Sequence, residues 1–261
     1  MNLGIEGRTA LVLGSGGGLG RAIALRLAEN GVRCLLGDVH QPSVDETARL
    51  IAEKGGASHT VVWNLGEPGA FDARYADLPD GFRNIDILVN NTGGPPPTLV
   101  SGQPAESWER HFREMVLSVI ELTDRLLPGM RERKWGRVVT SASSGVIAPI
   151  PNLGLSNSLR STLVGWSKTL AREVAPDGIT CNMIVPGRIA TRRIVELDEA
   201  KAKREGISPE AVAAASTATI PMKRYGRPDE YADCVAFLAS ERAAYITGSV
   251  IRVDGGMLAN V

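Results

Sequence analysis

The sequence has no excess of charge of either sign. Among its 261 residues, lysine and arginine together number 29, and so do aspartate and glutamate. Because the formal net charge is zero, no overall electric field would draw the protein to nucleic acid or to a membrane surface. We therefore expect neither of these partners, and we expect a small-molecule ligand instead.

Cysteine is also scarce. The three cysteines, Cys34, Cys181 and Cys234, show no spacing typical of metal ligands, and each lies in an apolar segment. This pattern predicts reduced thiols within a core and no metal site. The N-terminal residues do not read as a signal peptide, and no apolar run is long enough to cross a bilayer, so we expect a cytoplasmic protein.

The sequence does contain a regular alternation of short apolar runs and amphipathic stretches of helical period. Alternation of this kind predicts right-handed crossovers and a parallel sheet of about seven strands with helices on both faces. With no shift in composition along the chain, we expect a single α/β domain over residues 1–261. The predicted strands cover residues 8–13, 33–37, 59–63, 85–89, 137–140, 180–185 and 249–253.

The segment at about 188–220 interrupts this alternation just after a predicted strand. It is polar, helical in pattern and rich in alanine. An insertion at the carboxyl end of a strand lies where parallel sheets bind their ligands, so we interpret this segment as a lid over the substrate.

A glycine-dense turn joins the first predicted strand to the first predicted helix. Glycines in such a turn let the backbone approach a pyrophosphate, whose charge then lies against the amides that open the helix. A flexible loop is the alternative, but the strand before and the helix after favour dinucleotide binding. The predicted contacts here are Gly14, Ser15, Gly18, Leu19 and Gly20.

Asp38 ends the second predicted strand, where a carboxylate can accept hydrogen bonds from the adenosine ribose and would repel a 2′-phosphate. Neither lysine nor arginine stands beside Asp38 in the sequence, and the loop position at Gly17 is not basic. These features favour NAD as the cofactor over NADP. We expect further cofactor contacts where the third and fourth strands end, from Asn64, Leu65, Asn90, Asn91 and Gly93.

Over nearly its full length the chain resembles the short-chain dehydrogenase/reductase family, and within it the 3-oxoacyl-ACP-reductase-like and sugar-dehydrogenase-like members. The matching motifs are Gly14-x-x-x-Gly18-x-Gly20, Asn90-Asn-Thr-Gly93, Pro186-Gly187 followed by Thr191, and the tail from Ile246 to Gly256. The resemblance implies a Rossmann-type doubly wound sheet, nicotinamide chemistry, cofactor contacts from Pro186, Gly187 and Ile189, and a homotetramer or homodimer.

The active site that the resemblance implies is altered in this sequence. The family uses a serine, then a tyrosine and a lysine four residues apart on the next helix, with an asparagine on the preceding long helix. In this chain Ser143 occupies the serine position, whereas Ser156, Arg160 and Met115 stand at the tyrosine, lysine and asparagine positions. Arginine stays protonated and cannot relay protons as lysine does, but it can bind the nicotinamide ribose and stabilise an alkoxide.

We therefore predict a divergent catalytic set of Ser143, Ser156 and Arg160, with proton exchange left to water that the two serines hold. Ser156 and Arg160, at positions i and i+4, would face the cleft together. His111 lies one helical turn before Met115 and could replace the missing acid; we favour a histidine on the helix surface or in an interface.

Three arginines follow the Pro186-Gly187 motif at the mouth of the predicted cleft. Arg188, Arg192 and Arg193 could grip a carboxylate, phosphate or sulfonate, which would make the substrate anionic or sugar-like. Alternatively they form a solvated loop paired with Glu196 and Asp198.

Two main functions remain open from the sequence, besides an isomerase or lyase that would use the cleft without net hydride transfer. One is an NAD-dependent oxidoreductase that transfers a hydride between nicotinamide and a secondary alcohol or ketone. The alternative is a catalytically silent homologue that binds dinucleotide and has a structural or regulatory role. The cation retained at Arg160 favours the enzyme.

Overall fold

A single parallel sheet of seven strands forms the centre of the computed structural model, which describes residues 2–67 and 70–260. The strand order is β3-β2-β1-β4-β5-β6-β7, and all pairings are parallel. The Rossmann-type fold predicted from the sequence is confirmed. The strands are β1 (Thr9–Leu13), β2 (Arg33–Asp38), β3 (Ser58–Val62), β4 (Ile87–Asn90), β5 (Gly136–Ser141), β6 (Ile179–Pro186) and β7 (Val250–Val253).

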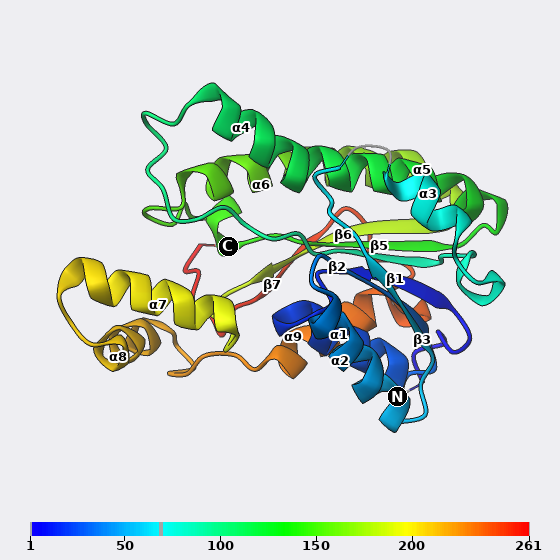
Figure 1. Cartoon of the computed structure of the whole chain (residues 1–261), viewed down its shortest axis with the longest axis horizontal. Helices are drawn as coiled ribbons and strands as arrows, with labels where there is room; N and C mark the ends of the chain where they lie inside the picture. Colours follow the sequence, from blue (N-terminus) through cyan, green and yellow to red (C-terminus); the bar gives the residue numbers. More distant parts are fainter. Residues whose placement is uncertain (1, 68–69, 261) are drawn as a thin grey trace.

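Helices cover both faces of this sheet (Figure 1). Helices α1, α2 and α9 pack on one face, and α4, α5 and α6 pack on the other, so the core divides into apolar clusters on either side. The helices are α1 (Gly18–Glu29), α2 (Gln41–Glu53), α3 (Ala70–Ala76), α4 (Ala105–Phe112), α5 (Ser118–Glu132), α6 (Gly154–Val174), α7 (Arg192–Glu205), α8 (Pro209–Thr219) and α9 (Pro228–Leu238).

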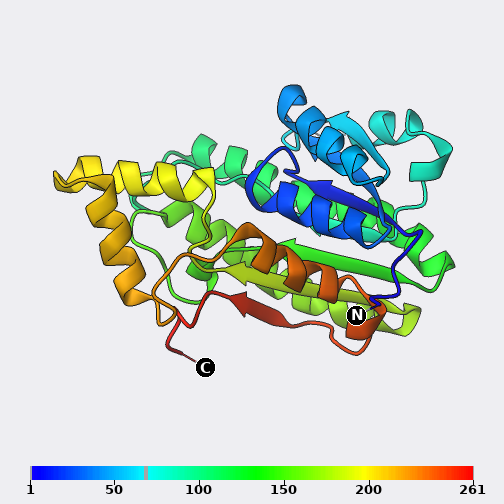
Figure 2. The same ribbon diagram turned by 90° about the horizontal axis from the view of Figure 1, so that it is seen from below.

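Helices α7 and α8 extend beyond the carboxyl ends of the strands (Figures 1 and 2). They occupy the segment that the sequence predicts as an insertion. The strand order reverses between β1 and β4, and parallel sheets bind ligands beside such a reversal, at the carboxyl ends of the strands. The fold therefore places the segment 188–220 beside the expected ligand site.

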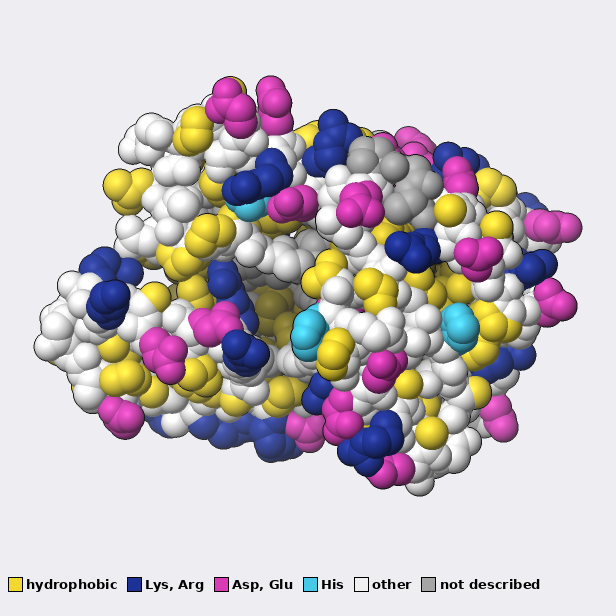
Figure 3. Space-filling view, viewed as in Figure 1, with side chains coloured by type: hydrophobic (Ala, Val, Ile, Leu, Met, Phe, Trp, Pro, Cys, Tyr) yellow, Lys and Arg dark blue, Asp and Glu magenta, His cyan; other side chains and the backbone are white. Residues whose placement is uncertain are grey.

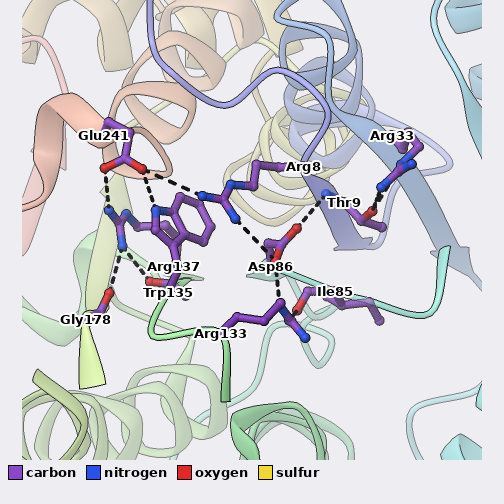
Figure 4. Close-up of polar contacts among 11 residues, drawn as sticks. Arg8, Thr9, Arg33, Ile85, Asp86, Arg133, Trp135, Arg137, Gly178 and Glu241 are labelled. Carbon is purple, nitrogen blue, oxygen red and sulfur yellow. Dashed lines mark hydrogen bonds and ion pairs between the residues drawn. The ribbon is translucent and has the colours of Figure 1, made fainter. Parts of the chain in front are cut away.

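The opposite end of the sheet is held by charged side chains around Trp135 (Figure 4). The guanidinium carbons of Arg8 and Arg137 lie 3.9 and 4.3 Å from the centre of the indole ring, and the indole N–H donates to Glu241 over 2.6 Å. Arg137 is 2% exposed and donates to the carbonyl of Gly178, and burial lowers its pKa. Cation–π contact and hydrogen bonding offset the cost of burying this charge.

Asp86 completes this network at the amino end of β4 (Figure 4). Its carboxylate accepts hydrogen bonds from the backbone N–H of Thr9 over 3.1 Å and from Nε of Arg133 over 3.0 Å. Asp86 is buried, so these donors replace the water that its charge loses on folding. The network ties β1 and β4 together at the end of the sheet away from the ligand site.

Two of the three cysteines are buried and the third is half-buried, and all three are free thiols. Burial raises the pKa of Cys34 to about 12, so this thiol is inert at neutral pH. Among the residues described, no helix combines the length and the apolarity that crossing a membrane requires.

Candidate active site

Two adjoining cavities lie at the carboxyl ends of the strands. The larger has a volume of about 750 Å³ and the smaller about 310 Å³. They are continuous, because Gly14, Asp38, Asn91, Gly93 and Gly94 line both. Figure 3 shows the hollow from outside, with basic side chains in its wall. Together the two cavities form an elongated groove across the point where the strand order reverses.

The glycine-dense turn lies in the wall of the larger cavity. Gly14 and Gly18 have φ values of +61° and +50°, which favour glycine. A Cβ on Gly20 would lie 2.0 Å from the carbonyl oxygen of Gly14, so only glycine fits there. Gly17, at the N-cap of α1, offers no side chain to the first-turn amides, which therefore remain available to an anion. This cradle fits a pyrophosphate.

Asp38 is the last residue of β2 and lines both cavities. One carboxylate oxygen accepts from the backbone N–H of Gly16 over 2.8 Å, and the other accepts from the N–H of His40 over 3.1 Å. Arg21 directs its guanidinium to the carbonyls of Gly16 and Ser43 and is absent from the lining of either cavity. The groove thus presents a carboxylate at this position.

The smaller cavity contains the ends of β3 and β4. Asn64 and Leu65 line it, as does Trp63, which the sequence analysis did not single out. Asn90 is 1% exposed, lines neither cavity, and points its amide toward Thr123 and Thr140 over 3.4 Å. Its neighbour Asn91 does line the groove.

His111 is a correction to the sequence analysis. It is buried rather than exposed, with Nδ1 3.0 Å from the Glu114 carboxylate and Nε2 3.2 Å from Arg110. It lines the smaller cavity with Met115, away from the serines of the larger one. Met115 lies in a π-helical turn, Arg113–Leu117, between α4 and α5. The helix-surface position expected for His111 is wrong, because the residue is 7% exposed and lies in the wall of the smaller cavity.

The two predicted catalytic serines line the larger cavity. Ser143 follows β5, and its hydroxyl accepts from the backbone N–H of Gly145 over 3.1 Å, which leaves its proton free to donate. Ser156 lies in the first turn of α6, and its hydroxyl has no hydrogen-bond partner among the residues described. Both hydroxyls are therefore able to bind a ligand oxygen.

Arg160 lies one helical turn after Ser156 and lines the same cavity, as its spacing predicts. The side chain is buried and donates to the backbone carbonyls of Ser141, Thr92 and Gly93 over 3.3, 3.1 and 2.9 Å. Burial, with a smaller contribution from the charge of Arg193, lowers the pKa of Arg160 to about 10. The group still carries its charge at neutral pH. These carbonyls fix the cation at the ends of β4 and β5.

Sequence reasoning missed a tyrosine beneath this site. Tyr231, on α9, is buried, and its hydroxyl lies 2.8 Å from that of Ser141, which lines the larger cavity. Burial raises the pKa of this phenol, so it stays protonated at neutral pH. In the sequence Tyr231 is one apolar-face residue of an amphipathic helix, and only the packing of α9 under β5 brings it here.

Pro186, Gly187 and Ile189 line the larger cavity together with Leu19, whereas Ser15 and Gly20 lie behind the glycine turn and line neither cavity.

The three arginines that follow Gly187 are placed differently from one another. Arg188 donates to the buried carboxylate of Asp198 over 2.7 Å, and Arg192 pairs with Glu196 over 3.0 Å.

Arg193 makes a different contact. It donates to the carbonyl of Pro95 over 3.0 Å, and no carboxylate among the described residues pairs with it. The structure therefore combines both interpretations of these arginines, since two form pairs within the segment and one keeps an unpaired charge at the cavity.

Comparison with known proteins extends these observations to the whole chain. A family model described as enoyl-(acyl carrier protein) reductase matches residues 14–258. The 3-oxoacyl-(acyl-carrier-protein) reductase FabG of Escherichia coli is 34% identical over 258 residues, covering 98% of this chain and 99% of the relative. FabG of Vibrio cholerae is 32% identical over 257 residues, with 98% and 99% covered.

Solved structures share the fold closely. The L-sorbose reductase of Gluconobacter frateurii, complexed with NADPH and L-sorbose, has 33% identity and a TM-score of 0.94, and each chain covers 100% of the other. YwfH, an NADPH-dependent reductase of bacilysin biosynthesis, has 27% identity and a TM-score of 0.92, covering 97% of this chain and 99% of its own. The chain belongs to the short-chain dehydrogenase/reductase family and is an oxidoreductase of that nicotinamide-dependent family.

Proposed function

We propose that this protein is an NAD-dependent oxidoreductase that interconverts a secondary alcohol and a ketone through a divergent site of Ser143, Ser156 and Arg160. The observation that carries the proposal is the buried cation of Arg160 in the cavity that both serine hydroxyls line. A buried charge without a carboxylate partner is costly, and such groups concentrate at functional sites.

The groove supports a dinucleotide bound along its length. The pyrophosphate would lie on the glycine turn and the first-turn amides of α1, and the adenosine end in the smaller cavity beside Asn64 and Leu65. The nicotinamide end would lie in the larger cavity, near Pro186 and Ile189. Asn91 and Gly93 line both cavities and would border the middle of the cofactor.

The preference for NAD rests on Asp38. Its carboxylate lies in the wall of the groove, where it would accept hydrogen bonds from ribose hydroxyls and repel a 2′-phosphate. The sorbose reductase relative was crystallised with NADPH, so this preference would distinguish the present chain from that relative.

A bound nicotinamide supplies or accepts the hydride. The residues of this chain would position the substrate and manage charge. The free hydroxyl of Ser156 and the donating proton of Ser143 would hold the substrate oxygen. Arg160 would stabilise negative charge developing on that oxygen and would not give up its own proton, because its pKa is about 10. The proton would come from water held by the two serines.

The segment 188–220 would act as a lid, because Thr191, the N-cap of α7, and the first turn of that helix lie in the wall of the larger cavity. From the family resemblance we also propose a homotetramer or homodimer in the cytoplasm, and the free, buried thiols suit a reducing compartment. Light scattering of the purified protein measures the oligomeric state.

The test is a turnover assay followed by the absorbance of reduced nicotinamide, with NAD or NADP and a panel of sugars, polyols, hydroxy acids and acyl thioesters. We expect turnover by the native protein and its loss in Arg160→Ala. The matched variant is Ser156→Tyr/Arg160→Lys, which restores the family pair. Turnover by that variant alone would mean that the native protein is silent, and failure to bind either dinucleotide would refute the proposal outright.

A further inference from the structure

The larger cavity retains positive charge after its ion pairs are formed. Four arginines line it, and the carboxylates of Asp198 and Glu196 each pair with one of them. Arg160 and Arg193 remain, and neither has a carboxylate within ion-pair distance among residues 2–67 and 70–260. The remaining acid in the wall, Asp38, is engaged by two backbone amides at the glycine turn.

These two unpaired guanidinium groups flank one small volume. A Cβ built on Gly94 would lie 3.7 Å from Nη2 of Arg160 and 3.9 Å from Nη2 of Arg193. Gly94 itself lines both cavities, so this volume opens into the groove. Like charges brought this close repel each other unless an anion lies between them. In agreement, Arg193 contributes to lowering the pKa of Arg160.

Both groups also have hydrogen-bond donors to spare. A guanidinium carries five N–H donors, and Arg160 spends both of those on Nη2 and one of those on Nη1 on backbone carbonyls. Beside Gly94 this residue therefore contributes its charge, and its spare donors are on Nε and Nη1. Arg193 spends one on the carbonyl of Pro95. The first turn of α7, which contains Arg193, adds the positive end of a 14-residue helix whose N-cap, Thr191, makes no side-chain cap hydrogen bond.

We propose that Arg160 and Arg193 together bind the anionic group, a carboxylate or a phosphate, of a small-molecule substrate. This inference rests on the proposed function, because the anion would belong to the alcohol or ketone that Ser143 and Ser156 hold. It assigns the contact to Arg193 rather than to Arg188 and Arg192, whose charges are already compensated. The substrate class is a hydroxy acid or a phosphorylated sugar.

Calorimetric titration in the presence of saturating NADH tests the proposal with two matched pairs of probes. D-Gluconate is compared with the neutral polyol D-glucitol, and glucose 6-phosphate with glucose. We expect at least one anion to bind about 10-fold or more tightly than its neutral counterpart, because hydrogen bonds between charged groups are stronger than neutral ones. A difference between gluconate and glucitol would identify a carboxylate as the bound group, and a difference between glucose 6-phosphate and glucose would identify a phosphate. Binding should weaken as salt is added.

The decisive variant is Arg193→Gln, which removes the charge and keeps hydrogen-bonding atoms. It should weaken anion binding about 10-fold or more, and leave the affinity for NADH, measured by its fluorescence, unchanged. Arg204→Gln is the matched control, because Arg204 lies on the same helix, is exposed, and pairs with Glu205 instead of lining the cavity. That variant should bind the anion as the native protein does.

Three results would overturn the inference. The anions could bind no more tightly than the neutral probes, or Arg192→Gln could weaken anion binding more than Arg193→Gln. The anions could also compete with NADH, in which case the arginine pair would bind the cofactor's own phosphates. Titration of the anions without NADH separates this inference from the proposed function. If the protein fails to bind NADH but binds an anion in a way that depends on Arg193, the anion site is supported and only dinucleotide binding, and with it the proposed function, is refuted.

Discussion

Replacing Gly20 with alanine tests the glycine turn at its tightest point. The added Cβ would lie 2.0 Å from the Gly14 carbonyl oxygen, 2.6 Å from the Gly14 carbonyl carbon and 3.0 Å from the Ser15 Cα. All three are backbone atoms, so no side-chain rotation relieves the contact. The end of β1 and the start of α1 must separate by roughly 1 Å to restore ordinary contact distances.

That displacement has two measurable consequences. Overpacking of this kind destabilises by about 1–3 kcal/mol, which would lower the melting temperature by at least about 2 °C. Moving the turn amides by roughly 1 Å would weaken their hydrogen bonds to a pyrophosphate, each worth about 1.5–3 kcal/mol, so NADH should bind about 10-fold or more weakly. Urea unfolding measures the first effect, and titration of NADH fluorescence measures the second.

Gly17→Ala is the matched control within the same turn. Gly17 has an extended backbone with φ of −172°, and a Cβ there would meet no atom within 4 Å. This variant should therefore lose less than about 1 kcal/mol of stability. The reasoning is refuted if Gly20→Ala binds NADH as tightly as the native protein, or if the two variants lose equal stability.

Three further outcomes follow from the charged residues. Asp38→Ala should shift the ratio of NADPH to NADH affinity about 10-fold or more toward NADPH, since it removes a charge that repels the 2′-phosphate; an unchanged ratio would contradict the role of Asp38. Asp86→Ala should lower the free energy of unfolding, measured in urea, by about 1–3 kcal/mol, because it leaves the buried N–H of Thr9 without an acceptor and removes the partner of the half-buried Arg133. It should not alter the affinity for NADH, because Asp86 lies at the far end of the strands. In the native protein kcat/KM should not fall with rising pH below about pH 9 through Arg160, since the pKa of this residue is about 10. In Arg160→Lys kcat/KM should fall at lower pH, because burial lowers the pKa of a lysine from its ordinary ~10.4 and the cation is lost as the pH rises through that pKa. Identical pH profiles of the two proteins would count against a charged role for Arg160.

The sequence by itself determined the sheet and the glycine-dense turn. Apolar runs alternating with amphipathic helices specify a parallel sheet, and the predicted strands agree with the observed ones to within one or two residues at each end. The glycine spacing also carries its own physical reason, since the positive φ at Gly14 and the close approach at Gly20 are local properties of the backbone. Sequence patterns predict these features because each depends on neighbouring residues of the same segment.

The partner that each cavity arginine takes depends instead on how separate elements pack. The three arginines within residues 188–193 look equivalent in the sequence. In the structure Asp198, ten residues beyond Arg188, compensates that arginine, and the carbonyl of Pro95 accepts from Arg193. His111 lies buried in the wall of the smaller cavity, and the packing of α9 places Tyr231 under Ser141. These outcomes were decided only by the tertiary structure, because the direction of a side chain and the identity of its partner follow from how separate elements pack, which residue type and spacing do not encode.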